Sequence, residues 1–216
     1  MTHDRKSEVV VLVHGLCGSR LDMYPLARRL EQLGFTVSNW GYWSPRTTVQ
    51  KQAQRLSDHL STIQSDPRTT QVHLVGHSMG AIIIRAMLAH LDDDTSVAKL
   101  RRLVMLAPPN RGSHTARRLA PWLNWLAPSL SEISDAANSY VNQLPNSPLV
   151  RRLEFGIVQA SKDRVIHPHS VPLDGQTDFA CVQGHHGFLA WYPKAIQLVE
   201  EFLIQGRFGN EKTALA

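Results

Sequence analysis

One serine lies in a sequence context that suits nucleophilic chemistry. The pentapeptide 76–80, Gly-His-Ser-Met-Gly, follows the apolar run Val72–Val75 and precedes an apolar stretch that starts at Ala81. A serine hydroxyl is a weak nucleophile, so it must be held against a base and a substrate carbonyl at the same time. A sharp turn between a strand and a helix does this, and flanking glycines let neighbouring backbone pack closely around the turn. The pattern therefore predicts a nucleophile at Ser78.

Strands and helices alternate along the rest of the chain, which would position such a turn. Short β-branched or apolar runs predict strands at residues 9–14, 35–40, 71–75, 100–106, 155–160 and 179–182. Apolar residues at helical spacing predict helices at 21–33, 47–64, 78–91 and 193–204. This alternation is typical of an α/β fold, with a mostly parallel sheet and helices on both faces. The length of 216 residues suits a single domain.

The segment from Pro108 to about Val150 interrupts the alternation. It is rich in Pro, Ser and Asn, and it holds Trp122 and Trp125 among apolar neighbours. Connections of this length are usually functional lids or linkers, and the aromatic content favours a lid or cap over disorder. From Gly206 onward we expect a frayed end.

Composition excludes several classes of protein. The formal charge is +5, but the arginine pairs that contribute to it are spread along the chain and are not interleaved with aromatic residues in a basic cluster, so nucleic-acid binding is not expected. The sequence has no His-Glu-x-x-His pattern or Cys/His cluster, and we expect neither a metal nor a cofactor. Residues 1–8 are polar, and no apolar run approaches the roughly 20 residues of a membrane span. A cytoplasmic protein without an obligate protein partner is the expectation.

Three segments together resemble the α/β-hydrolase superfamily, and within it the small lipase and esterase branch. They are 13–18 (Val-His-Gly-Leu-Cys-Gly), 76–80 and 184–189 (Gly-His-His-Gly-Phe-Leu). A fourth segment, 106–113, is also similar to GPI-inositol-deacylase-like proteins. The resemblance extends from Val9 to about Ile204. It implies a minimal α/β-hydrolase sheet of about six strands, in one domain with a lid or cap insertion at about 108–150.

The resemblance also implies the other two members of a catalytic triad. The acid should follow the strand after the insertion, which indicates Asp163, although Ala160 replaces the glycine that many family members have in this loop. The base should lie between the last strand and the last helix. His186 fits that place, and His185 is the alternative. The acid would hold the histidine in one tautomer and stabilise its charged form.

Substrate contacts follow from the same resemblance. The backbone N–H groups of Leu16 and Met79 are expected to form an oxyanion hole. We expect substrate-binding residues at His14, Arg111, Trp122 and Trp125, with Asn110 also near the mouth of the site. The tryptophans either line an acyl pocket, face lipid, or are buried against the core; the sequence leaves these alternatives open.

The sequence therefore predicts a serine hydrolase that cleaves carboxylic esters through an acyl-enzyme, as an esterase or lipase. Its partner would be a small-molecule or lipid ester, and transient contact with a membrane or lipid surface stays open. A thioesterase, amidase or acyltransferase on the same scaffold is the alternative, because a fold does not fix the reaction. A second alternative is a non-catalytic binding protein that has kept the serine turn.

Overall fold

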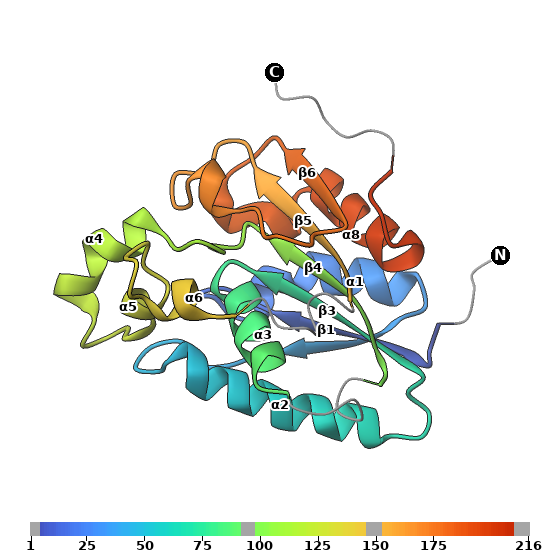
Figure 1. Cartoon of the computed structure of the whole chain (residues 1–216). Coiled ribbons are helices and arrows are strands. Elements are labelled where there is room, and N and C mark those ends of the chain that lie inside the picture. The colour runs from blue at the N-terminus through green and yellow to red at the C-terminus, as the bar shows by residue number, and fades with distance from the viewer. Residues whose placement is uncertain (1–4, 92–97, 146–152, 210–216) are drawn as a thin grey trace.

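A six-stranded sheet runs through the centre of the protein (Figure 1). The computed structural model describes residues 5–91, 98–145 and 153–209. All five strand pairings are parallel, in the order β2-β1-β3-β4-β5-β6. The strands are β1 (Glu8–Val13), β2 (Thr36–Trp40), β3 (Gln71–His77), β4 (Leu100–Leu106), β5 (Glu154–Ala160) and β6 (Asp178–Val182). The expected parallel α/β-hydrolase sheet is confirmed.

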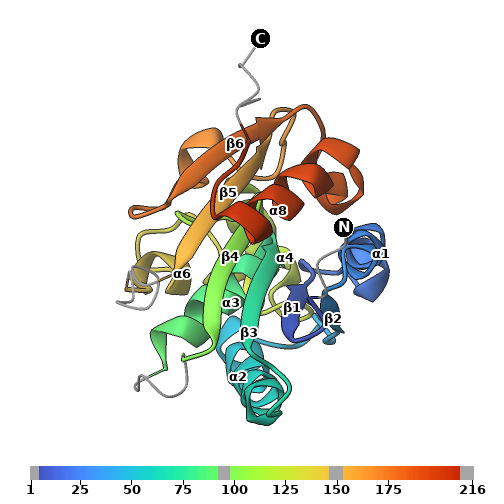
Figure 2. The same ribbon diagram turned by 90° about the vertical axis from the view of Figure 1, so that its right-hand side faces the viewer.

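Helices cover both faces of this sheet, as Figure 2 shows. One face carries α1 (Tyr24–Gln32) and α8 (Pro193–Gln205), and the other carries α2 (Val49–Ser65) and α3 (Met79–Ala89). Side chains alternate between the two faces along each strand. In β1, Val10 and Leu12 pack towards α1 and α8, while Val9, Val11 and Val13 pack towards α2 and α3. The sheet is thus buried on both sides, which explains the continuous apolar strands.

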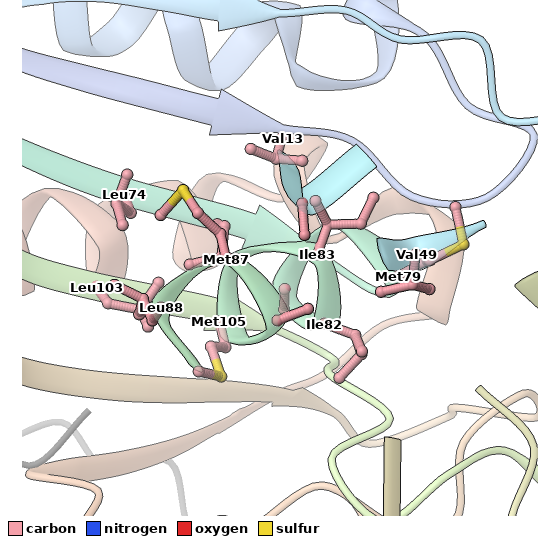
Figure 3. Close-up of a cluster of buried hydrophobic side chains, with 14 of the residues drawn as sticks. Val13, Val49, Leu74, Met79, Ile82, Ile83, Met87, Leu88, Leu103 and Met105 are labelled. Atoms are coloured by element: carbon pink, nitrogen blue, oxygen red, sulfur yellow. The ribbon is translucent and has the colours of Figure 1, made fainter. Parts of the chain in front are cut away.

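The helix that follows the serine turn is buried on all sides. Every residue of α3 from Met79 to Leu88 is buried, because the sheet, α2 and the β4–β5 connection surround the helix. Figure 3 shows its side chains among those of Val13, Leu74, Leu103 and Met105. Such packing fixes the start of α3, and with it the serine that precedes the helix.

Short helices fill the connection between β4 and β5. They are α4 (His114–Leu123), α5 (Ser129–Glu132) and α6 (Tyr140–Gln143), and they project beyond one end of the sheet (Figure 1). Residues 146–152, which include the end of the insertion expected at about 108–150, lie outside the described residues. Three 3-10 turns complete the described elements: η1 (Arg20–Met23), η2 (Pro168–Ser170) and η3 (His186–Trp191).

The expectation of a frayed end from Gly206 is wrong for residues 206–209. Gly206 ends α8 in the left-handed conformation, with φ of 78°, and turns the chain back. Phe208 is 2% exposed and packs against Phe202, with ring centroids 5.1 Å apart. Its N–H donates to Asp178 Oδ2 at 2.9 Å. Burial of one aromatic ring thus anchors this stretch; residues 210–216 lie outside the described residues.

Among the described helices, none has the length and apolar character that crossing a bilayer requires.

Gly80 gives a direct test of how closely α3 approaches β1. A Cβ atom at Gly80 would lie 2.3 Å from the carbonyl oxygen of Val13 and 2.5 Å from that of His14, and both atoms belong to backbone that cannot turn aside. We expect Gly80→Ala to lower the free energy of unfolding by about 1–3 kcal/mol or more in urea denaturation. The matched control is Gly187→Ala, where nothing lies within 4 Å of the added atom. Equal stability of the two variants would contradict this close approach.

Candidate active site

Ser78 occupies a turn between β3 and α3 whose backbone is strained. Its φ is 52° and its ψ is −122°, a region that residues other than glycine rarely adopt. The Ser78 N–H donates to the Leu106 carbonyl at 2.8 Å, and the Ser78 carbonyl accepts from Ala81 N–H at 3.0 Å. A Cβ atom at Gly76 would lie 2.6 Å from Ala81 Cα, so glycine is needed there for the turn to close. The surroundings thus fix a conformation that the serine alone would avoid.

An imidazole lies against the hydroxyl of this serine. His186 Nε2 is 2.9 Å from Ser78 Oγ, although the two residues are 108 positions apart. His186 begins η3, after β6, and its side chain is 12% exposed. The alternative residue, His185, is exposed, and its N–H donates to the hydroxyl of Tyr192. The structure therefore brings His186 to Ser78 and leaves His185 at the surface.

A buried carboxylate holds the other side of the imidazole. Asp163 Oδ2 accepts from His186 Nδ1 at 2.7 Å, and Asp163 Oδ1 accepts from the N–H groups of Val165 and Ile166, each at 2.8 Å. Burial raises the pKa of Asp163, but the bond and charge of His186 and the two N–H groups lower it more, so the net pKa is below its ordinary value. An ionised carboxylate at Nδ1 leaves Nε2 free to accept a proton from the hydroxyl.

The loop that carries Asp163 is fixed from a second direction by the start of α4. Ser113 Oγ donates to the Val165 carbonyl at 2.9 Å, and Thr115 Oγ1 donates to the Arg164 carbonyl at 3.4 Å. Ser113 also caps α4 through the N–H of Ala116. The position of Asp163 therefore depends on both the β5–β6 connection and the β4–β5 connection.

A cavity of about 220 Å³ opens over the serine. Its lining residues come from the loop after β1, from the serine turn and from the loop after β6: Gly15, Leu16, Cys17, Gly18, Asp22, His77, Ser78, His186 and Gly187. A larger cavity of about 700 Å³, lined in part by Lys6, Thr36 and Arg68, lies at the other end of the strands. We assign the site to the smaller cavity, because ligands of α/β folds bind at the carboxyl ends of the strands.

Two backbone N–H groups close to Ser78 in the chain or in the fold are available to a bound oxygen atom. Leu16 lies in the loop after β1, and Met79 is the first residue of α3, where helical N–H groups have no partner within the helix. Neither N–H donates a hydrogen bond to another residue in the described part of the chain. The side chain of Met79 is buried in the core (Figure 3), so any contribution of this residue to a site at Ser78 would come from its backbone N–H alone.

The four residues expected to bind substrate do not line this cavity. His14 has no exposed surface, because its ring is stacked on Tyr42 at 4.2 Å, and this burial corrects the expectation of a substrate contact. Arg111 is exposed, and its Nη2 lies 3.8 Å from Asp174 Oδ1. Trp122 and Trp125 are 78% and 71% exposed on the β4–β5 connection, which excludes burial against the core in this structure.

Asn110 lies deeper than the mouth position expected for it. It is 3% exposed, and its side chain joins Arg85 of α3 to the Val171 carbonyl. Arg85 itself is buried, and its guanidinium donates to both Oδ1 and the carbonyl oxygen of Asn110 at 3.1 and 3.0 Å. Burial lowers the pKa of Arg85 to about 10, so the group stays charged at neutral pH. An apolar helix gives no sequence signal for this contact.

His77, next to Ser78 in the turn, bonds to the loop that carries His186. Its Nε2 is 2.9 Å from the His186 carbonyl, and it must donate this bond because a carbonyl oxygen only accepts. Burial, with a smaller effect from His186, lowers the pKa of His77 from 6.5 to about 4. A neutral His77 thus links the serine turn to the backbone of His186.

The depressed pKa of His77 makes stability depend on pH. Since the unfolded chain binds more protons than the folded one between about pH 4 and 6.5, the free energy of unfolding should fall by up to about 3 kcal/mol from this group as pH drops through that window. Glutamine retains an N–H donor but does not titrate, so His77→Gln should flatten the slope in urea titrations from pH 4 to 8. His185→Gln, at the exposed neighbour, is the control. An unchanged slope in His77→Gln would refute the assignment.

Proteins of known structure share this fold. The mature lipase BlEst2 from Bacillus licheniformis is 18% identical, with a TM-score of 0.74 and 91% of each chain covered. Lipase B from Aspergillus fumigatus is 15% identical, with a TM-score of 0.67, covering 92% of this chain and 52% of that one. A metagenomic carboxyl esterase is also 15% identical, with a TM-score of 0.63, covering 84% of this chain and 65% of that one. Likeness at such low identity concerns the fold alone.

No curated protein matches the sequence. The model of the "Alpha/beta hydrolase family", however, matches residues 10–200, which is most of the chain. The parallel sheet, the serine turn after β3 and this match lead to one conclusion: the protein belongs to the alpha/beta hydrolase family.

Proposed function

We propose that this protein hydrolyses carboxylic esters through an acyl-enzyme formed on Ser78. One observation carries the proposal: the imidazole of His186 bonds Ser78 Oγ through Nε2, at 2.9 Å, and Asp163 Oδ2 through Nδ1, at 2.7 Å. This is the arrangement in which a histidine removes the proton of a serine hydroxyl while a carboxylate fixes its tautomer. The lipases and the esterase of similar fold support an ester as the substrate.

The reaction would proceed in two balanced halves. Ser78 Oγ attacks the ester carbonyl carbon as its proton moves to His186 Nε2, and the carbonyl oxygen becomes an oxyanion near the N–H groups of Leu16 and Met79. The C–O bond to the alcohol then breaks, and the alcohol leaves with the proton from His186. Water attacks the acyl group by the same route, releases the carboxylic acid and returns the proton to Ser78. Each oxyanion donor lowers the barrier by roughly 3–4 kcal/mol.

The β4–β5 connection supports a finer proposal, that the ester is presented at a lipid surface. Trp122 and Trp125 are joined there by the partly exposed Leu119, Leu123 and Leu126. Arg117 and Arg118 are exposed on α4, and residues 113–131 contain no Asp or Glu. Arg117 forms an ion pair with Asp135 at 3.0 Å. Exposed tryptophan and leucine beside basic residues suit shallow insertion among anionic lipid headgroups.

The triad proposal is tested with two conservative variants, one that removes a single atom and one that preserves size. We expect the wild-type protein to hydrolyse p-nitrophenyl esters and to be labelled by a fluorophosphonate probe. Ser78→Ala should abolish labelling and lower kcat about 10⁴-fold or more, because the nucleophile is gone. Asp163→Asn should lower kcat by roughly 10³–10⁴-fold, because the amide stabilises the wrong tautomer of His186.

Other outcomes of these assays identify the alternatives. Faster turnover of acyl thioesters or amides would indicate a thioesterase or amidase, and transfer to an added alcohol would indicate an acyltransferase. A wild-type protein that is folded by circular dichroism but neither labelled nor active would contradict hydrolysis and favour a binding protein.

Contact with lipid is tested separately, with vesicles of phosphatidylcholine alone or mixed equally with phosphatidylglycerol. Flotation should recover the wild-type protein with the anionic vesicles, and Trp122→Ala/Trp125→Ala should weaken that binding by about tenfold or more, because two aromatic side chains that would insert into the lipid are removed. The control is Leu21→Ala/Tyr24→Ala, which removes exposed apolar groups, 71% and 53% exposed, outside the connection. Equal loss in both double variants would contradict a specific lipid contact.

A further inference from the structure

The carbonyl oxygen of Gly15, beside the cavity, is held by several donors at once. It accepts from His14 Nδ1 at 2.9 Å, from the Gly18 N–H at 3.2 Å and from the Tyr42 hydroxyl at 3.4 Å. The Tyr42 hydroxyl also donates to the His14 carbonyl at 2.9 Å. This hydroxyl comes from the loop after β2, so a second segment of the chain fixes the loop after β1.

The same β2 loop holds the other side of Leu16. Ser44 is 1% exposed, and its hydroxyl accepts from the Cys17 N–H at 2.8 Å. The two peptide groups that flank the Cα atom of Leu16 are therefore both bonded to residues 42–44. The Leu16 N–H lies between these two contacts and donates to no other described residue.

The bonds of His14 agree with a single, neutral form of its ring. Nδ1 must donate, because the Gly15 carbonyl only accepts, and Nε2 must accept, because its neighbour at 3.4 Å is the Tyr42 N–H. Burial lowers the pKa of His14, so its ring stays neutral at neutral pH, and burial raises the pKa of Tyr42, so its hydroxyl keeps its proton. The rings lie parallel, with an interplanar angle of 4°.

A trans peptide group turns its carbonyl oxygen and its N–H in opposite directions. The Gly15 oxygen points at the His14 ring and the Tyr42 hydroxyl, so the Leu16 N–H of the same peptide group points away from them. We propose that Tyr42 and Ser44 are positioning residues that orient the Leu16 N–H towards the oxyanion formed on Ser78. A donor aimed in advance needs no reorganisation when the charge develops, and this is the main source of such stabilisation.

This inference rests on the proposed ester hydrolysis, so its test measures the transition state as well as folding. Tyr42→Phe removes the hydroxyl but keeps the stacked ring, and Ser44→Ala removes the second bond independently. For a soluble p-nitrophenyl ester, each variant should lower kcat by about 5- to 30-fold while KM stays within about twofold, less than the loss of a whole oxyanion donor. Active sites are counted by end-point fluorophosphonate titration, so unfolded protein does not enter kcat.

Inhibition by phenylboronic acid separates positioning from a purely structural role. Its boron atom bonds to Ser78 Oγ and forms a tetrahedral anion whose oxygen takes the place of the oxyanion. The inhibition constant should rise by the same factor as kcat falls, because both report the transition-state geometry. The pH dependence of kcat should stay unchanged, since Tyr42 and Ser44 do not contact His186. Tyr24→Phe, at a tyrosine that is 53% exposed, is the matched control and should equal wild type.

Several results would overturn the inference. A lower melting temperature with unchanged kcat and boronate affinity in both variants would show that residues 42–44 act on stability alone. A raised KM with unchanged kcat would show that they affect ground-state binding. A wild-type protein that cleaves no ester and whose Ser78 is unreactive would contradict the proposed function itself. A wild-type protein that is active, with variants that are equally active, would contradict only the positioning role of Tyr42 and Ser44.

Discussion

The two hydrogen bonds of the His186 imidazole join side chains from three loops that are far apart in the sequence. Ser78 is 108 positions away and Asp163 is 23 positions away, yet both bonds are shorter than 3.0 Å. Interactions between residues close in sequence cannot bring these three side chains into contact. Their contact depends on the parallel pairing of β3, β4, β5 and β6, which brings the carboxyl ends of all these strands to one edge of the sheet. Any shift in strand register would separate the hydroxyl, the imidazole and the carboxylate.

The same edge also imposes close backbone contacts. The turn at Ser78 is accommodated only because Gly76 and Gly80 allow β3, α3 and β1 to approach one another without side chains between them. Gly15 continues this contact, since a Cβ atom there would lie 3.2 Å from that of Ser78. The strained φ of Ser78 is thus compensated by the packing of a wholly buried helix behind it. Strain at the serine and burial of α3 are two aspects of one arrangement.

The sequence predicted well what depends on periodicity and on short motifs. Apolar runs located all six strands, and the glycine spacing around Ser78 located the turn, because both signals are local. The contacts of Tyr42, Arg85 and Asn110 could not be read in this way, since each joins elements whose distance is set only by the folded sheet. The substrate contact predicted for His14 was wrong for a related reason. The motif indicates that His14 lies near the site, but the stacking on Tyr42 that buries its ring is a tertiary contact that the sequence does not show. Phe208 shows the limit for chain ends, where a single buried ring outweighs a polar composition.

The attachment of α4 to the acid loop has a mechanical consequence. Ser113 and Thr115 are tied to the carbonyls of Val165 and Arg164, so the first turn of α4 moves with the loop that carries Asp163. A swing of the exposed tryptophans relative to the site must therefore pivot beyond Thr115, or else it would drag the carboxylate out of line with its imidazole. Pro121, inside α4, removes a helical hydrogen bond in the part of the helix that is free of these ties. The rest of the connection is held elsewhere, because the Leu126 carbonyl accepts from the Arg46 N–H at 2.6 Å. The segment that bears the tryptophans is therefore attached at two separate places, the loop of Asp163 and the loop after β2, and a change in either loop would alter how the tryptophans are presented.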